Sequence, residues 1–191
     1  MRIAFAGNPN SGKTTMYNAL TGRNERVGNW AGVTVERKES SIKKSYYDGA
    51  EELVAVDLPG AYSMSPFTSE ESITSSYVKN ENPDAIINIV DATNLSRSLF
   101  FTTQLLELGV PVVDVKRLSE RLGCPVVKTV STSSGHEGLK EAVSQAAALK
   151  GKGQKAPYVQ ENINLHDKAA VEAADRKRFE FVNSIVKEVE A

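Results

Sequence analysis

An eight-residue segment near the N-terminus constrains the fold more than any other part of this chain. Residues 7–14 read GNPNSGKT and match the phosphate-binding pattern G-x-x-x-x-G-K-S/T in full. The segment follows the apolar run IAFA at residues 3–6 and precedes a helical pattern. A loop between a strand and a helix can direct backbone N–H groups at phosphate oxygens. The sequence therefore predicts an α/β fold that binds a nucleoside triphosphate.

Two side chains of this loop have predicted roles of their own. Lys13 can reach the β and γ phosphates, and the Thr14 hydroxyl can bind Mg²⁺. The other positions are expected to contact the nucleotide through the backbone or through short side chains. The predicted nucleotide contacts of the loop are Gly7, Asn8, Pro9, Asn10, Ser11, Gly12, Lys13, Thr14 and Thr15.

Composition limits the class of protein. The 191 residues are 40% hydrophobic and 25% charged, with a net charge of −1, as in ordinary globular domains. The chain has no surplus of basic residues that would indicate a surface for nucleic acid or for an anionic membrane. The one cysteine, Cys124, cannot form an internal disulfide, which favours a reducing compartment. No apolar run approaches the roughly 20 residues that span a bilayer, so we expect a soluble, cytoplasmic chain.

Short strand-like runs alternate with helical patterns over about the first 150 residues. This order predicts an α/β fold with a mainly parallel sheet. Strands are expected at 3–6, 35–46, 52–56, 84–90, 110–113 and 125–130, and helices at 15–20, 69–79, 95–108, 115–122 and 138–149. Residues 23–33 are expected to form a loop, and Ser69 is the predicted N-cap of its helix.

The composition changes near residue 150. KGKGQKAP at 150–157 has no apolar side chain larger than alanine and is typical of a linker. Residues 167–189 have apolar spacings that fit one or two amphipathic helices. The predicted domains are a nucleotide-binding domain at 1–149, a linker at 150–158 and an incomplete helical subdomain at 159–191.

A second nucleotide signal is the DLPG segment at residues 57–60, directly after a predicted strand. An acidic residue here can help to hold Mg²⁺, so Asp57 is a predicted metal residue. Gly60 can offer its N–H to the γ-phosphate, and Leu58 and Pro59 complete the predicted contact segment. The alternative is a strand that ends in an ordinary Pro-Gly turn.

Thr34 is the candidate second hydroxyl ligand of Mg²⁺. It follows Val33 in the glycine-bearing loop after the first helix, and both are predicted nucleotide contacts. A loop that grips the γ-phosphate and releases it after hydrolysis would act as a switch. The alternative is a β-branched residue that simply begins a strand. Trp30, in the same loop, fits either a mobile aromatic of the switch or an anchor of the loop.

Four strings of the sequence resemble one known family. They are GNPNSGKTT at 7–15, VGNWAGVTVERKE at 27–39, VDLPGAYS at 56–63 and VDATNLSRSL at 90–99. Together they resemble the cytosolic GTPase domain of the ferrous iron transporters called FeoB, over about residues 2–149. The resemblance implies a Ras-like G domain of the P-loop NTPase class that binds GTP or GDP with Mg²⁺ and K⁺.

The resemblance also implies a larger protein. RKRFEFVNSIV at 176–186 resembles the helical segment that in this family precedes the membrane-embedded iron pathway. The expected partners are therefore a guanine nucleotide and the membrane-embedded iron-transport domain of the same polypeptide. The expected place is the cytoplasmic face of the bacterial inner membrane, where the domain would regulate Fe²⁺ uptake. An oligomer is left open.

The resemblance assigns roles at matching positions. Asn10 matches the asparagine that helps to hold K⁺ in potassium-activated relatives, where the cation would supply positive charge in the transition state. The alternative is an asparagine favoured by turn geometry. Ala61 stands where Ras-like enzymes carry a water-orienting glutamine, so slow turnover is expected. The residues expected to act in hydrolysis are Asn10, Lys13, Thr34 and Gly60.

The base-recognition motif N/T-K-x-D is absent from the sequence. Either the chain has lost this loop, or the sequence omits a segment between the 110–113 run and the residues that follow. The helical pattern after the gap favours the second explanation. The remaining predicted contacts with the base are Ser131, Thr132 and Ser133, for which a polar strand-to-helix loop is the alternative. Guanine selectivity therefore depends on the resemblance.

Other functions compete with an iron-linked GTPase. An RNA-associated or ribosome-assembly GTPase also often lacks the glutamine, but the near-neutral charge counts against it. A nucleotide switch with incidental hydrolysis is the third possibility. Glu36 and Glu39 resemble an iron-binding E-x-x-E, yet on a strand their side chains point to opposite faces. We therefore reject them as a metal site.

Overall fold

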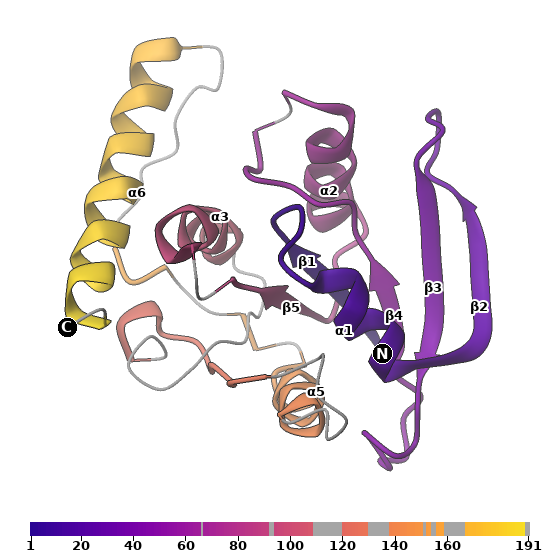
Figure 1. Ribbon diagram of the computed structural model, residues 1–191. Coiled ribbons are helices and arrows are strands. Elements are labelled where there is room, and N and C mark those ends of the chain that lie inside the picture. Colours follow the sequence, from indigo (N-terminus) through magenta and orange to yellow (C-terminus); the bar gives the residue numbers. More distant parts are fainter. Residues whose placement is uncertain are drawn as a thin grey trace.

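A computed structural model of the chain describes residues 1–65, 67–91, 94–108, 120–129, 138–150, 152–153, 156–158 and 167–189. Figure 1 shows a central sheet with helices on both faces. The elements, in chain order, are β1 (Arg2–Gly7), α1 (Lys13–Leu20), β2 (Thr21–Asn29), β3 (Glu36–Ile42), β4 (Val54–Asp57), α2 (Ser69–Asn80), β5 (Ala85–Ile89), α3 (Leu95–Glu107), α5 (Leu139–Ala148) and α6 (Lys168–Val189). The predicted α/β class is confirmed.

The sheet of the described residues has the strand order β2-β3-β4-β1-β5. Strand β1 lies between β4 and β5 and is parallel to both, while β3 is antiparallel to β2 and to β4. The sheet is therefore mixed: β4, β1 and β5 run parallel on one side, and β3 pairs antiparallel with its neighbours on the other. Because the carboxyl ends of β1 and β4 meet at one edge, the loops after Gly7 and Asp57 lie side by side there.

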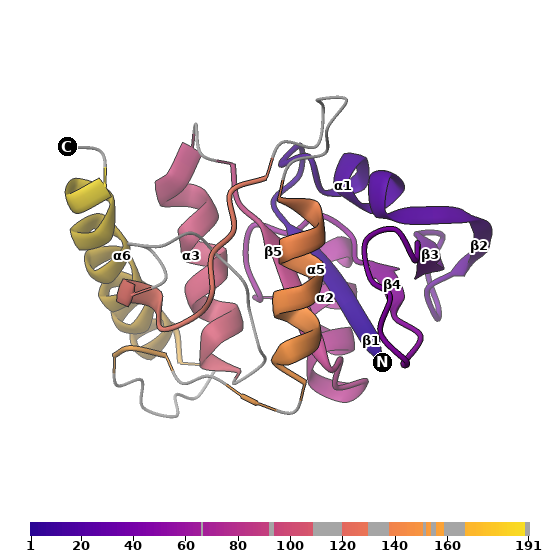
Figure 2. The ribbon, with the colours of Figure 1, turned by 90° about the horizontal axis from the view of Figure 1, so that it is seen from below.

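Successive side chains of the buried strand β1 point to opposite faces of the sheet, and each face has its own hydrophobic core. Ile3 and Phe5 pack with α1 and α5 on one face, and Ala4 and Ala6 pack with α2 and α3 on the other. This two-residue period is expected for a strand that is covered on both faces. Figure 2 shows α5 lying across the face that α1 also covers. The central strands are therefore covered by helices on both faces.

Helix α6 packs against α3, on the side away from the sheet, in both views (Figures 1 and 2). Arg178 donates two hydrogen bonds to the carboxylate of Glu107, at 2.9 and 2.6 Å, and both side chains are about nine-tenths buried. Burial alone would lower the pKa of Arg178, but the hydrogen bonds and charges of Glu107 and Asp175 raise it. The tail is one helix in the described residues.

Three local predictions are wrong. Residues 21–29 form strand β2, where a loop was expected over 23–33; the side chains of residues 26–29 are all exposed, so no alternation marks the strand. Residues 125–129 form no strand, and the run that would have paired beside them, 110–113, lies outside the described residues. Thr68, not Ser69, is the N-cap of α2, because its hydroxyl accepts from the Glu71 N–H at 3.1 Å.

Candidate functional site

The phosphate loop runs from the end of β1 to the start of α1. Two of its residues have left-handed backbone angles, Asn10 with φ 65° and Gly12 with φ 89°. Gly12 is the N-cap of α1, so the loop ends at a helix N-terminus, where backbone N–H groups lack partners within the helix. Asparagine tolerates this conformation, so the turn-geometry explanation of Asn10 stands beside its predicted role toward K⁺.

A cleft of about 700 Å³ opens above this loop. Eight of the residues predicted from the sequence line it: Asn8, Pro9, Asn10, Gly12, Lys13, Thr14, Thr15 and Gly60. The lining does not include the other predicted residues that the structure describes, namely Gly7, Ser11, Val33, Thr34, Asp57, Leu58 and Pro59. The cleft thus joins the phosphate loop to the end of the DLPG turn.

Lys13 and Asp57 form an ion pair beside the cleft. Their side chains are only 10% and 13% exposed, so the two charges are largely removed from water. Each then stabilises the other, because a buried charge without a partner of opposite charge is costly. These are the two side chains predicted to hold the terminal phosphates and Mg²⁺. In this structure each is the ion-pair partner of the other.

The DLPG turn is tied to the phosphate loop by backbone contacts. The Leu58 N–H donates to the Phe5 carbonyl and the Ala61 N–H to the Gly7 carbonyl, both at 3.1 Å. A Cβ atom on Gly60 would lie 3.1 Å from the backbone of Pro9, which is closer than an ordinary contact. A glycine is therefore needed where the turn passes the loop.

Thr34 lies at the tip of the β2–β3 hairpin and is exposed. The tip is closed by a 2.9 Å hydrogen bond from the Trp30 N–H to the Val35 carbonyl, and the Val33 N–H donates to the Trp30 carbonyl at 3.2 Å. Trp30 itself is buried, with 6% of its surface exposed. In this structure Trp30 anchors the loop, and Thr34 stands outside the cleft lining.

Sequence reasoning missed four residues of the cleft: Tyr62, Thr68, Glu70 and Glu71. They belong to the segment after the DLPG turn and to the first turn of α2. A hydrogen bond from its own backbone N–H and another from the Ser69 hydroxyl lower the pKa of Glu70. Tyr62 lies inside the VDLPGAYS string but had no predicted role, and Thr68, Glu70 and Glu71 lie outside every string that indicated a nucleotide contact.

Some predicted features lie elsewhere. Ser131, Thr132 and Ser133 are outside the described residues, as is the segment around the missing base-recognition motif. Glu36 pairs with Lys38 and Glu39 with Arg37, which fits the expected opposite faces of β3. Among the described residues, no group of three or more acidic, histidine or cysteine side chains could hold a metal ion by itself.

The family model described as ferrous iron transport protein B matches residues 1–115 of the chain. The chain belongs to the FeoB family. Fe(2+) transporter FeoB of Salmonella typhimurium is 46% identical over 166 residues, and that of Escherichia coli K12 is 44% identical over 169 residues. These matches cover 76% and 78% of the chain but only 21% of each relative.

Solved structures of FeoB domains share this fold. A mutant of S. thermophilus NFeoB bound to GDP has a TM-score of 0.80 and 30% identity, and the match covers 98% of both chains. The cytosolic domain of L. pneumophila FeoB has a TM-score of 0.79 and 26% identity, again over 98% of both chains. The Ras-like P-loop fold expected from the sequence is thereby confirmed.

The chain spans about a fifth of the length of the FeoB relatives named above. The Salmonella match runs over 166 positions yet takes up only 76% of 191 residues, so the relative has positions inside the matched stretch that this chain lacks. Within the part of the chain that the structure describes, no helix is both long enough and apolar enough to cross a bilayer.

Proposed function

We propose that this chain binds GTP and GDP with Mg²⁺ and hydrolyses GTP, as the cytosolic part of a ferrous iron transporter. The observation that carries the proposal is the cleft itself, where the GNPNSGKT loop and Gly60 form adjoining walls. The S. thermophilus domain with 98% mutual coverage is described as bound to GDP. Family membership links this nucleotide chemistry to Fe²⁺ transport.

The loop residues present a suitable set of donors for a triphosphate. Lys13 brings an ammonium group to the cleft wall, and the N-terminus of α1 adds backbone N–H groups. Thr14 is exposed in the wall, so its hydroxyl is free to meet a Mg²⁺ ion. Magnesium sites of this kind take only one or two protein oxygens and fill the rest with phosphate and water. Thr14 and Asp57 fit that requirement.

Binding must exchange partners at the Lys13–Asp57 pair. In the proposed complex Lys13 turns to the β and γ phosphates, and Asp57 turns to the metal side. Mg²⁺, when bound, neutralises charge on the phosphate oxygens. Lys13 would then exchange a carboxylate for a phosphate, and Asp57 would exchange an ammonium group for Mg²⁺. Neither buried charge is left unpaired. This exchange keeps both buried charges paired when the nucleotide binds.

Hydrolysis by this chain is proposed to be slow. Gly60, which lines the cleft, is proposed to donate its N–H to the γ-phosphate, and Thr34 would provide the second hydroxyl for Mg²⁺ once its loop moves. Ala61 has no side-chain group that orients water, so backbone groups must do so. A K⁺ ion held by Asn10 would supply positive charge that an arginine supplies elsewhere. The proposed catalytic set is therefore Asn10, Lys13, Thr34 and Gly60.

The remaining assignments extend the same proposal. Ser131, Thr132 and Ser133 are proposed to contact the guanine base. Residues 1–149 form the G domain, 150–158 the linker and 159–191 part of the helical subdomain. The membrane-embedded domain of the full-length protein is the proposed partner, and the cytoplasmic face of the inner membrane is the proposed place.

Nucleotide titration tests the binding proposal. We expect fluorescent GDP to bind the purified chain with Mg²⁺, to be displaced by GTP, and to resist ATP. Lys13→Ala should weaken triphosphate binding by at least tenfold, as loss of a charge-assisted contact implies. Lys44→Ala is the matched control, because Lys44 is exposed and is not among the residues that line the cleft. Equal binding by the two variants would contradict the assignment of the site.

The role of Asn10 needs a separate test. Asn10→Gly keeps the left-handed backbone that φ 65° requires and removes only the side-chain amide. We expect GTP turnover by the wild-type chain to be faster in KCl than in NaCl, and this difference to disappear in Asn10→Gly. If the variant keeps the full difference, the asparagine serves turn geometry and the potassium assignment fails.

A further inference from the structure

A cluster of aromatic and charged side chains lies under the loop that carries Thr34. The Arg37 guanidinium lies 4.7 Å from the centroid of the Trp30 ring, and the Trp30 and Tyr77 rings meet edge to face with centroids 5.5 Å apart. Trp30 is 6% exposed and Tyr77 2% exposed. The ring that anchors the hairpin tip is therefore held between a cation on β3 and an aromatic side chain on α2.

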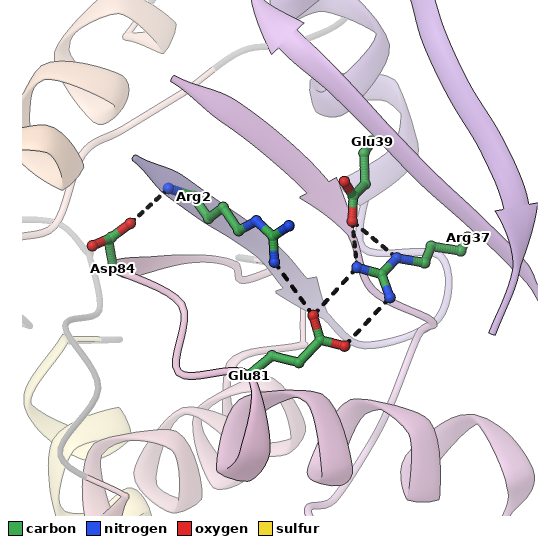
Figure 3. A network of polar contacts seen from close by, with 5 residues as sticks. All are labelled: Arg2, Arg37, Glu39, Glu81 and Asp84. Atoms are coloured by element: carbon green, nitrogen blue, oxygen red, sulfur yellow. Dashed lines mark hydrogen bonds and ion pairs between the residues drawn. The ribbon is translucent and has the colours of Figure 1, made fainter. Parts of the chain in front are cut away.

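The charged end of Arg37 continues the cluster to the end of α2 (Figure 3). Its Nε donates to Glu39 at 2.9 Å, and its two terminal nitrogens lie 3.3 and 3.2 Å from the carboxylate oxygens of Glu81. Arg2 reaches the same Glu81 carboxylate at 3.4 Å but does not touch Trp30 in any contact of the described residues. In the part of the chain that the structure describes, Arg37 is thus the side chain that contacts both the Trp30 ring and this ionic network.

Helix α2 connects this cluster with the nucleotide cleft. Its first turn supplies Glu70 and Glu71 to the cleft wall, whereas Tyr77 and Glu81, at its other end, hold Trp30 and Arg37. Thr34 lies on the β2–β3 hairpin tip, which is closed by the hydrogen bond from the Trp30 N–H to the Val35 carbonyl. For Thr34 to reach a metal in the cleft, this tip has to open.

The buried position of Trp30 leaves polar atoms without hydrogen bonds. The indole Nε1 and the Tyr77 hydroxyl are buried and have no hydrogen-bond partner among the described residues. A buried donor without an acceptor is destabilising, so the ring is held by stacking and packing alone. Trp30 can therefore leave this buried position when another interaction draws the loop away.

We propose that Arg37 is a positioning residue that, through Trp30, holds the Thr34 loop outside the cleft until a triphosphate binds. A diphosphate has no γ-phosphate that could draw Thr34 inward. Trp30 therefore stays in its buried position when a diphosphate binds. This inference rests on the proposed function, because it concerns the response of the same cleft to GTP. In the withdrawn state Thr34 is unavailable to the metal, so the cluster limits the fraction of molecules that are ready to hydrolyse.

Nucleotide affinities test this proposal. A ligand that needs a minor state gains affinity when that state becomes more populated, and a ligand that accepts both states does not. Loss of a cation–π contact in Arg37→Ala should therefore strengthen binding of a non-hydrolysable GTP analogue by about two- to fivefold. Affinity for GDP should stay unchanged.

Two variants serve as controls. Arg2→Ala removes an ion pair to Glu81 but leaves the Trp30 ring covered, so both affinities should match those of the wild type. Arg37→Lys keeps a positive charge near Glu39 and Glu81 and loses the planar stack, so its affinity for the analogue should lie between those of the wild type and Arg37→Ala. Equal changes for GDP and the analogue, or no change in either, would overturn the proposal.

Trp30 is the only tryptophan in the chain and reports its own position. We expect its emission to shift to longer wavelength with the GTP analogue and Mg²⁺, and not with GDP. Emission that stays the same with both nucleotides would contradict the displacement of Trp30. If the wild-type chain bound neither nucleotide, the proposed function and this inference would both fall. If it bound both but Arg37→Ala changed nothing, only the inference would fall.

Discussion

At the scale of single residues, Lys13 and Asp57 balance each other's charge at a largely buried position beside the cleft. The pair is nearly nine-tenths buried on each side, so removing one member leaves the other without a partner. A lone buried charge is costly, and Lys13 would then bind phosphate more readily. The pair therefore competes with the ligand that the site is proposed to bind.

We expect Asp57→Asn to separate the two effects. Without Mg²⁺, GDP should bind this variant more tightly than the wild type, by about tenfold, because Lys13 no longer has a carboxylate partner. The gain in affinity that Mg²⁺ gives the wild type should be lost. Titration of GDP with Mg²⁺ and with a chelator measures both. Unchanged binding in the chelator would contradict the idea that Asp57 competes for Lys13.

Tyr77 gives a prediction for alkaline pH. Burial, with a further contribution from the Glu81 charge, raises the pKa of Tyr77 to about 12 from an ordinary value of 10. The fold thus favours the neutral phenol, so its stabilising contribution is complete below pH 10 and is lost between pH 10 and 12. In that range the free energy of unfolding should fall by about 1.4 kcal/mol per pH unit from this group.

Tyr77→Phe isolates this contribution. The variant keeps the ring against Trp30 and removes a buried hydroxyl that has no partner, so at neutral pH its stability should equal or exceed that of the wild type. Urea unfolding at pH 9 and pH 11 should show a smaller loss in Tyr77→Phe than in the wild type. Equal losses would mean that Tyr77 does not titrate as described.

At the scale of elements, helix α2 depends on its cap. Thr68 accepts a hydrogen bond from the Glu71 N–H, whereas the Ser69 hydroxyl bonds to Glu70 on the exposed side. Thr68→Ala should therefore lower the free energy of unfolding by about 1 kcal/mol, and Ser69→Ala should change it little. Urea unfolding measures both. The reverse order of effects would restore Ser69 as the cap.

The contact of α6 with α3 depends on a buried ion pair. Arg178→Ala leaves Glu107 without its guanidinium partner, and we expect a loss of about 3 kcal/mol in unfolding free energy. Arg176→Ala, an exposed arginine two residues earlier on the same helix, should cost less than about 0.5 kcal/mol. Similar losses for the two variants would show that the pair is not what holds α6 in place.

The elements show where the sequence was informative. Buried strands and amphipathic helices were predictable because burial leaves a pattern in the sequence: β5 is apolar at every position except Asn88, and α3 and α5 each have an apolar face. Strand β2 was not, because among the described strands it lies at the sheet edge beside β3, and the side chains of its residues 26–29 are exposed. The cap of α2 was missed by one residue, since threonine and serine both suit that position.

At the scale of the whole molecule, the site is built from segments that the fold brings together. The phosphate loop was predictable from its own motif, and Gly60 from a second motif next to it. Tyr62, Thr68, Glu70 and Glu71 were not predictable, because they reach the cleft through the path of the chain into α2. The position of Thr34 depends on a hairpin and a ring contact that no local pattern encodes.

Release of phosphate from GTP tests the central claim, that the GNPNSGKT cleft of this chain hydrolyses GTP. The measurement compares the wild-type chain with Lys13→Ala, in KCl with Mg²⁺. We expect slow but steady phosphate release by the wild type, and a rate at the level of the buffer for Lys13→Ala. No release by a wild-type chain that binds GTP, or equal release by the two proteins, would contradict it.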